Sequence, residues 1–144
     1  MSTRIHAALF DLDGVILDTE DQYTNFYGAI GCEYLPDVPD FALQIKGRTL
    51  VQIYDKWFPG KREIQTDITR RLNAFEQQMD YTLIPGFADF ICVLRDASIK
   101  TAIVTSSNDE KMHSVFAAHP EFHNLFDQIL TAKDYLASKP APDP

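Results

Sequence analysis

Apolar residues recur along this chain with two different periods, and each period predicts a different kind of element. Residues 7–10 form a short apolar run of strand length that ends at acidic residues. From about residue 18 to 81, apolar residues instead recur every three or four positions, the period of amphipathic helices. The helices predicted in this segment lie at 19–30, 50–57 and 64–79. We expect Gly31 to end the first of them and Thr49 to cap the second.

Alternation of strand and helix resumes after the Pro85-Gly86 pair. The elements predicted there are a helix at 87–94, a strand at 101–104, a helix at 108–118 and a strand at 128–131. Strands that alternate with helices favour a parallel sheet, so the predicted fold class is α/β with a helical insertion after the first strand. We expect residues 1–16 and 84–144 to form the α/β core and residues 17–83 to form a helical cap.

Two carboxylates stand where the first strand ends, in the order Asp11, Leu12, Asp13, Gly14. Side chains two apart on a buried strand point the same way, so we expect the two acids to converge just beyond the sheet, where Gly14 lets the backbone turn away. In open α/β sheets, ligands bind in the crevice beyond the carboxyl ends of the strands, where these acids are expected. An all-oxygen site of this kind suits Mg²⁺, and the spacing does not fit a calcium EF-hand loop. A solvated acidic turn is the alternative.

Hydroxyl groups follow the second strand in the same position, as Thr105, Ser106 and Ser107. Together with the first amides of the next helix they form a candidate oxyanion or phosphate site. Ser107 also fits the first position of a capping box, so we assign Ser107 mainly to capping, and Thr105 and Ser106 to ligand binding. Lys139, in a proline-rich segment after the third strand, is a candidate for binding a phosphate oxygen or a nearby carboxylate. A solvated lysine is the alternative.

Composition narrows the classes of partner. The chain has 144 residues, of which 45% are hydrophobic, and a formal charge of −8. That charge disfavours nucleic acid and anionic membranes, and a small anionic substrate would need local positive charge or a metal. No apolar stretch has membrane-spanning length, and no signal-peptide pattern is present. Cys32 and Cys92 lie beside apolar residues outside any C-x-x-C pair, so we predict buried thiols in a cytoplasmic protein.

Three segments together resemble the motifs of a known superfamily. They are Phe-Asp-Leu-Asp-Gly-Val at 10–15, Ile-Val-Thr-Ser-Ser at 103–107 and Ser-Lys-Pro-Ala-Pro-Asp at 138–143. With a helical insertion between the first two, the chain resembles the haloacid dehalogenase superfamily over essentially its whole length. The branch it resembles is that of β-phosphoglucomutase-like phosphatases and phosphomutases. The resemblance implies a Rossmann-like parallel sheet core with an inserted α-helical cap.

The resemblance also implies a role for each matching residue. Asp11 would be the nucleophile that forms an aspartyl-phosphate, and Asp13 would act first as general acid and then as general base. Mg²⁺ would bridge Asp11, the backbone carbonyl of Asp13 and the phosphate, so both residues are expected metal ligands. The other implied positions are Thr105, Ser106 and Lys139 for the phosphate, and Lys46 and Arg48 for the substrate from the cap.

Two departures from the family's pattern bear on activity. The acidic pair of the fourth motif has no counterpart before Pro144, so we expect the natural protein to continue further. Without that continuation the first strand is expected to be a sheet edge, and the 144 residues alone are expected to aggregate or be partly molten. The second departure concerns the mutase branch, which the resemblance implies has an arginine in the cap loop after Lys-Gly and a histidine in the first cap helix. Here Lys46-Gly47 matches but is followed directly by Arg48-Thr49-Leu50, and residues 18–27 contain no histidine, so both differences favour a hydrolase over a mutase.

The function expected from the sequence is therefore that of a Mg²⁺-dependent phosphatase of a small phosphorylated metabolite, such as a sugar phosphate. The first alternative is a β-phosphoglucomutase-type phosphomutase. The second is a non-catalytic binding module of the same fold. No nucleic-acid or membrane partner is expected, and a monomer is favoured.

Overall fold

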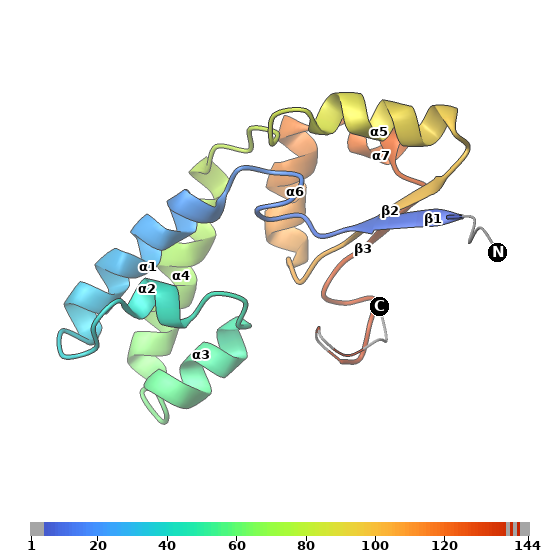
Figure 1. Ribbon diagram of the computed structural model, residues 1–144. Helices are drawn as coiled ribbons and strands as arrows, with labels where there is room; N and C mark the ends of the chain where they lie inside the picture. Colours follow the sequence, from blue (N-terminus) through green and yellow to red (C-terminus); the bar gives the residue numbers. More distant parts are fainter. Residues whose placement is uncertain (1–4, 138, 140, 142–144) are drawn as a thin grey trace. The chain divides into compact units, whose positions relative to one another are not determined.

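The computed structural model describes residues 5–137, 139 and 141 (Figure 1). Within these residues the chain divides into two compact units. Thr19–Met79 forms one of them, here called the helical unit. The described residues before and after it form the other, which holds the strands and is called the sheet unit. The predicted range of the cap, 17–83, stays a prediction.

Three strands of the described chain form one parallel sheet. β1 (Ala7–Phe10) pairs with β2 (Lys100–Val104), which in turn pairs with β3 (Gln128–Leu130). The register places Phe10 opposite Ile103. Because the strands are parallel, their carboxyl ends lie at the same edge of the sheet. The predicted fold class, an α/β fold with a parallel sheet, is confirmed.

The first strand is less buried than its apolar sequence predicted. Leu9 is 66% exposed. Phe10 packs edge to face against Phe87 and Phe126, with ring centroids 5.5 and 6.2 Å apart. Among the described strands, β1 has a neighbour on one side only. The expectation of a buried first strand is therefore wrong, because burial depends on the neighbouring elements as well as on the strand's own residues.

Helices of the sheet unit connect its strands. They are α5 (Phe87–Asp96), α6 (Asp109–Ala118) and α7 (Phe122–Leu125). α5 leads into β2 and α6 leaves from its carboxyl end, as the alternation of periods predicted. α7 was not predicted, because a helix of one turn is too short to show a period. The apolar side chains that these helices bury are those of Phe87, Ile91, Met112, Val115 and Phe122.

The helical unit consists of α1 (Glu20–Tyr34), α2 (Phe41–Gln44), α3 (Leu50–Trp57) and α4 (Arg62–Gln78). Its core is formed by buried residues from all four helices and the segments between them, namely Ile30, Phe41, Ile45, Ile53, Phe58 and Ile68.

The predicted N-cap of α3 is confirmed. The Thr49 hydroxyl accepts from the backbone N–H of Gln52 at 3.3 Å, and the Gln52 side chain accepts from the Thr49 N–H at 3.0 Å.

The predicted end of α1 is wrong. The helix continues through Gly31 to Tyr34. Gly31 is buried, and a Cβ atom built on it would lie 2.9 Å from Cβ of Phe41, the first residue of α2. A glycine at this position is explained by the close approach of two helices rather than by a helix end.

Both cysteines are exposed, Cys32 on α1 and Cys92 on α5. The prediction of buried thiols is therefore wrong, because burial depends on the elements packed around a residue and not on its sequence neighbours alone. In the part of the chain that the structure describes, no helix combines the length and apolar character needed to cross a membrane.

Candidate functional site

A tight turn after β1 holds the two acidic residues. The backbone N–H of Gly14 donates to the Leu17 carbonyl at 2.9 Å, and the N–H groups of Ile16 and Leu17 both donate to the Leu12 carbonyl at 3.0 Å. Gly14 has a φ of 72°, which glycine adopts without strain. Leu12, Ile16 and Leu17 are fully buried. The turn is therefore anchored by its apolar residues, and the acids that flank Leu12 stand on a fixed backbone.

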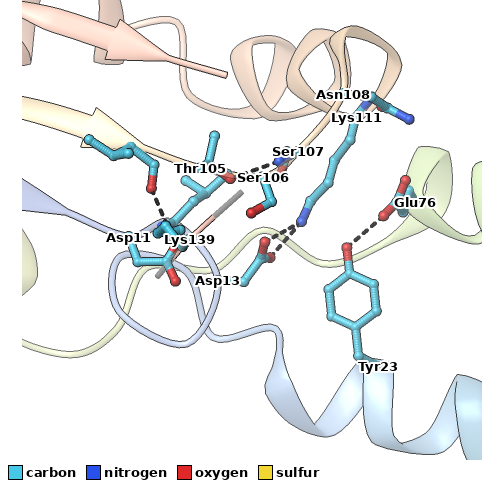
Figure 2. Close-up of polar contacts among 12 residues, drawn as sticks. Asp11, Asp13, Tyr23, Glu76, Thr105, Ser106, Ser107, Asn108, Lys111 and Lys139 are labelled. Carbon is cyan, nitrogen blue, oxygen red and sulfur yellow. Dashed lines mark hydrogen bonds and ion pairs between the residues drawn. The ribbon is translucent and has the colours of Figure 1, made fainter. Parts of the chain in front are cut away.

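The Asp11 carboxylate is held by a backbone amide and a lysine (Figure 2). Its Oδ1 accepts from the Leu12 N–H at 2.8 Å and lies 2.9 Å from Lys139 Nζ. The Lys139 ammonium also donates to the Val104 carbonyl at 3.2 Å, where β2 ends. About half of the Asp11 side chain remains exposed, so the carboxylate is accessible to a ligand.

The Asp13 carboxylate is held by a different lysine, which the sequence did not single out. Lys111 Nζ lies 2.6 Å from Asp13 Oδ1 and 2.5 Å from Oδ2. The lysine side chain is 4% exposed and that of Asp13 is 26% exposed. A signal was present in the sequence, since Lys111 falls in the first turn of a predicted helix, where the helix dipole disfavours a cation.

Thr105 and Ser107 interact with each other where β2 ends. The Thr105 hydroxyl donates to Ser107 Oγ at 2.9 Å and accepts from the Ser107 N–H at 3.1 Å. Both residues are buried, whereas Ser106 is exposed. Asn108 caps α6 by accepting from the Lys111 N–H at 2.9 Å. The assignment of Ser107 to capping is therefore wrong, because its side chain is engaged by Thr105 and the next residue supplies the cap.

The loop after β3 contacts Thr105 and Ser106. The Tyr135 hydroxyl donates to the Thr105 carbonyl at 2.9 Å and lies 3.5 Å from Ser106 Oγ. Asp134 accepts from the Thr131 N–H at 2.7 Å and from its hydroxyl at 3.0 Å. Both bonds hold the pKa of the Asp134 carboxyl below its usual range, and the bond from the backbone N–H has the larger effect. The loop that carries Tyr135 is thereby fixed next to Thr105.

The structure thus brings together the predicted site residues of the sheet unit at the carboxyl ends of β1 and β2 (Figure 2). These residues are Asp11, Asp13, Thr105, Ser106 and Lys139. The two predicted substrate residues of the cap belong to the helical unit. There Lys46 Nζ lies 3.2 Å from a carboxylate oxygen of Glu20, and the Arg48 guanidinium lies 5.6 Å from the centre of the Trp57 ring.

The donor set of the turn suits a hard cation. The candidate oxygen ligands at the end of β1 are those of Asp11 and Asp13, and within the described residues no group of three or more histidine, cysteine, aspartate or glutamate side chains is placed to hold a metal ion. Mg²⁺ is commonly bound through one or two carboxylates, with waters and substrate phosphate completing its shell. The exposed half of the Asp11 side chain leaves room for such an arrangement.

A family model described as haloacid dehalogenase-like hydrolase matches residues 8–144. The chain therefore belongs to this family, and the resemblance stated from the three sequence motifs is confirmed.

Relatives with names and structures lie within the same family. The curated protein named "Probable pseudouridine-5'-phosphatase" from Saccharomyces cerevisiae is 27% identical, over 96% of this chain and 63% of that protein. Beta-phosphoglucomutase from Bacillus subtilis is 28% identical, over 95% of this chain and 65% of that protein. The crystal structure of a haloacid dehalogenase-like hydrolase from Bacteroides fragilis matches with a TM-score of 0.76 at 16% identity, over 96% of this chain and 69% of that one. The last likeness shows the fold, and the chain spans about two thirds of the length of each relative.

Proposed function

We propose that the protein is a Mg²⁺-dependent phosphatase of a small phosphorylated metabolite, with Asp11 as the nucleophile. The observation that carries the proposal is the turn after β1, where two carboxylates on a fixed backbone are each held by a separate lysine. Family membership and a relative named as a phosphatase support the reaction class. The net charge of −8 supports a small substrate over a polyanion.

The proposed reaction has two steps. First, a carboxylate oxygen of Asp11 attacks the phosphorus, the bond from phosphorus to the ester oxygen breaks, and Asp13 gives its proton to the departing oxygen. Water then attacks the phosphorus, the bond between Asp11 and phosphorus breaks, and Asp13 takes the proton back from the water. Within the described residues both contacts of the Asp11 carboxylate fall on Oδ1, so Oδ2 is the oxygen that attacks.

Other groups of the site would hold the phosphate. The exposed Ser106 hydroxyl and the first N–H groups of α6 are donors at the start of a helix, where anions are favoured. Lys139 adds a point charge beside Asp11. Mg²⁺, bound by Asp11 and the backbone carbonyl of Asp13, would neutralise charge on the phosphate oxygens. From the cap, Lys46 and Arg48 remain the residues proposed to recognise the rest of the substrate.

A cytoplasmic location and a monomeric state belong to the same proposal. The chain has only two cysteines and no C-x-x-C pair, which gives little support for a disulfide framework and fits a reducing compartment.

The test is phosphate release from a panel of sugar phosphates and nucleotides, with and without Mg²⁺. We expect release from at least one small phosphate ester, loss of nearly all activity in Asp11→Asn, and a loss of about 10² to 10⁴-fold in Asp13→Asn, the usual effect of a positioned acid or base. Asp96→Asn, which changes an exposed carboxylate at the end of α5, is the control and should keep full activity. No release from any ester by the intact protein with Mg²⁺ present would instead favour a non-catalytic module.

The second candidate function is that of a phosphomutase, which the similarity to beta-phosphoglucomutase favours. The two reactions differ in whether the phosphoryl group on Asp11 passes to a sugar hydroxyl or to water. Conversion of a hexose 1-phosphate to its 6-phosphate faster than its hydrolysis would decide for the mutase.

A further inference from the structure

Lys111 occupies a position that is unfavourable for a lysine in two ways. Its side chain is 4% exposed, and lysine is almost never buried to this extent unless its charge is paired. It is also the third residue of α6, and a cation in the first turn of a helix faces the positive end of the helix dipole. The other two charged residues of that turn, Asp109 and Glu110, are acidic and exposed. The fold therefore has to compensate the burial of this one ammonium group.

The compensation comes from Asp13, across 98 residues of sequence. Nζ of Lys111 reaches both carboxylate oxygens, at 2.6 and 2.5 Å. At the other end of the same residue, the backbone N–H is fixed by the cap that Asn108 provides. An ammonium that contacts both oxygens limits rotation of the carboxylate about its Cβ–Cγ bond. The Asp13 carboxylate is therefore oriented from α6 as well as by its own turn.

We propose that Lys111 is a positioning residue that holds the Asp13 carboxylate in the orientation needed for proton transfer, an inference that rests on the proposed function. Lys111 keeps its own protons throughout. When Asp13 is protonated, the ammonium contacts only the oxygen without the proton, and the proton on the other oxygen passes to the ester oxygen and is later taken back from water. The two buried or half-buried lysines of the site thus have separate tasks, since Lys139 contacts Asp11 and the Val104 carbonyl instead. A direct role of Lys111 in binding phosphate is the competing explanation.

The first variant is Lys111→Met, which keeps much of the side-chain volume and removes the charge. We expect kcat to fall by about 10 to 100-fold with KM changed less than about threefold, because small misplacement of a catalytic group has effects of this size. The control is Lys133→Met. Lys133 Nζ lies 2.7 Å from a carboxylate oxygen of Asp109, which belongs to α6 as Lys111 does, but both side chains of this pair are about two thirds exposed. Removing this exposed pair should leave kcat and KM unchanged, and a matching loss in the control would contradict the proposal.

A double-mutant cycle tests whether Lys111 acts through Asp13. In the Asp13→Asn background, Lys111→Met should cause no further loss of kcat, since the group it positions is gone. If Lys111→Met lowers kcat by the same factor in both backgrounds, the proposal is overturned. An unchanged kcat in Lys111→Met would also overturn it, as would a raised KM together with weaker inhibition by inorganic phosphate, which is the signature of direct phosphate binding.

A second variant keeps the test valid if Lys111→Met does not fold, as judged by circular dichroism. Lys111→Arg retains the charge but displaces the contacting nitrogens. Its loss of kcat should be larger for an alkyl phosphate than for p-nitrophenyl phosphate, whose leaving group needs little help from a proton donor. Equal losses for both esters would refute positioning of Asp13. Phosphate release by the unmutated protein is measured in parallel, so that a failure of the proposed function is recognised separately, by absence of release in every sample.

Discussion

We expect the substitution of glycine by alanine to have opposite effects on stability at two positions of α1. Gly28 and Gly31 lie one turn apart on this helix. A Cβ atom added at Gly28 meets no atom within 4 Å, whereas one added at Gly31 lies 2.9 Å from Phe41 Cβ and 3.1 Å from its Cδ1. Because the shortest contact is with Cβ, rotating the Phe41 ring does not relieve it, and the main chain of α2 has to move.

The magnitudes follow from these distances. Alanine in place of glycine inside a helix stabilises by about 1 kcal/mol, and this gain applies at both positions. At Gly31 it is opposed by overpacking, which costs about 1 to 3 kcal/mol in a close-packed core. Phe41 is 3% exposed and has the rings of Trp57 and Phe58 at 5.6 and 6.2 Å. We therefore expect Gly28→Ala to stabilise by about 0.5 to 1 kcal/mol and Gly31→Ala to destabilise by about 1 to 2 kcal/mol.

Urea denaturation followed by circular dichroism measures both effects in the same protein. Each variant is its partner's control, since the chemical change and the helix are shared. The slope of free energy against urea should stay constant, so that a shift in midpoint reports stability. If Gly31→Ala stabilises as much as Gly28→Ala, the helix contact described here is wrong.

Two further predictions concern charged groups. Lys139→Met should lower kcat/KM by about 10²-fold, since it removes the ammonium 2.9 Å from Asp11, and steady-state kinetics that match those of the unmutated protein would refute this role. Hydrogen bonds from Arg70 and then from the Tyr34 hydroxyl hold the pKa of the Asp67 carboxyl below its ordinary value. A lowered folded-state pKa contributes stability that is present above the unfolded value, about 3.9, and is lost as pH falls toward the folded value. Stability should therefore fall less steeply below about pH 4 in Asp67→Asn than in the unmutated protein, as urea midpoints over this pH range would check.

The elements of the fold could be predicted wherever a local rule decides them. The apolar runs of β1, β2 and β3 and the capping box at Thr49 depend on residues close in sequence. The end of α1 could not be predicted in this way, because a glycine that ends a helix and a glycine that admits a neighbouring helix look alike in sequence. What distinguishes them is Phe41, ten residues further on.

The residues of the candidate site also differ in whether a local sequence pattern predicts them. Asp11 and Asp13 were predicted because two acids directly follow a strand, which is a local pattern. Lys111 was not, since its relation to Asp13 spans 98 residues and exists only when α6 stands beside the turn. The exposure of Leu9 and of both cysteines was missed for a related reason, as burial is set by neighbouring elements that the local sequence does not contain.

The most direct test of the proposed function is to identify the phosphorylated residue. The protein is mixed with a substrate found in the phosphate-release panel, quenched in acid during turnover and treated with borohydride, which reduces an acyl phosphate to the alcohol. Peptide mass spectrometry then locates the change. The proposed mechanism predicts homoserine in place of aspartate at position 11, and none in Asp11→Asn. Turnover with an unmodified Asp11, or with the modification on another residue, would contradict it.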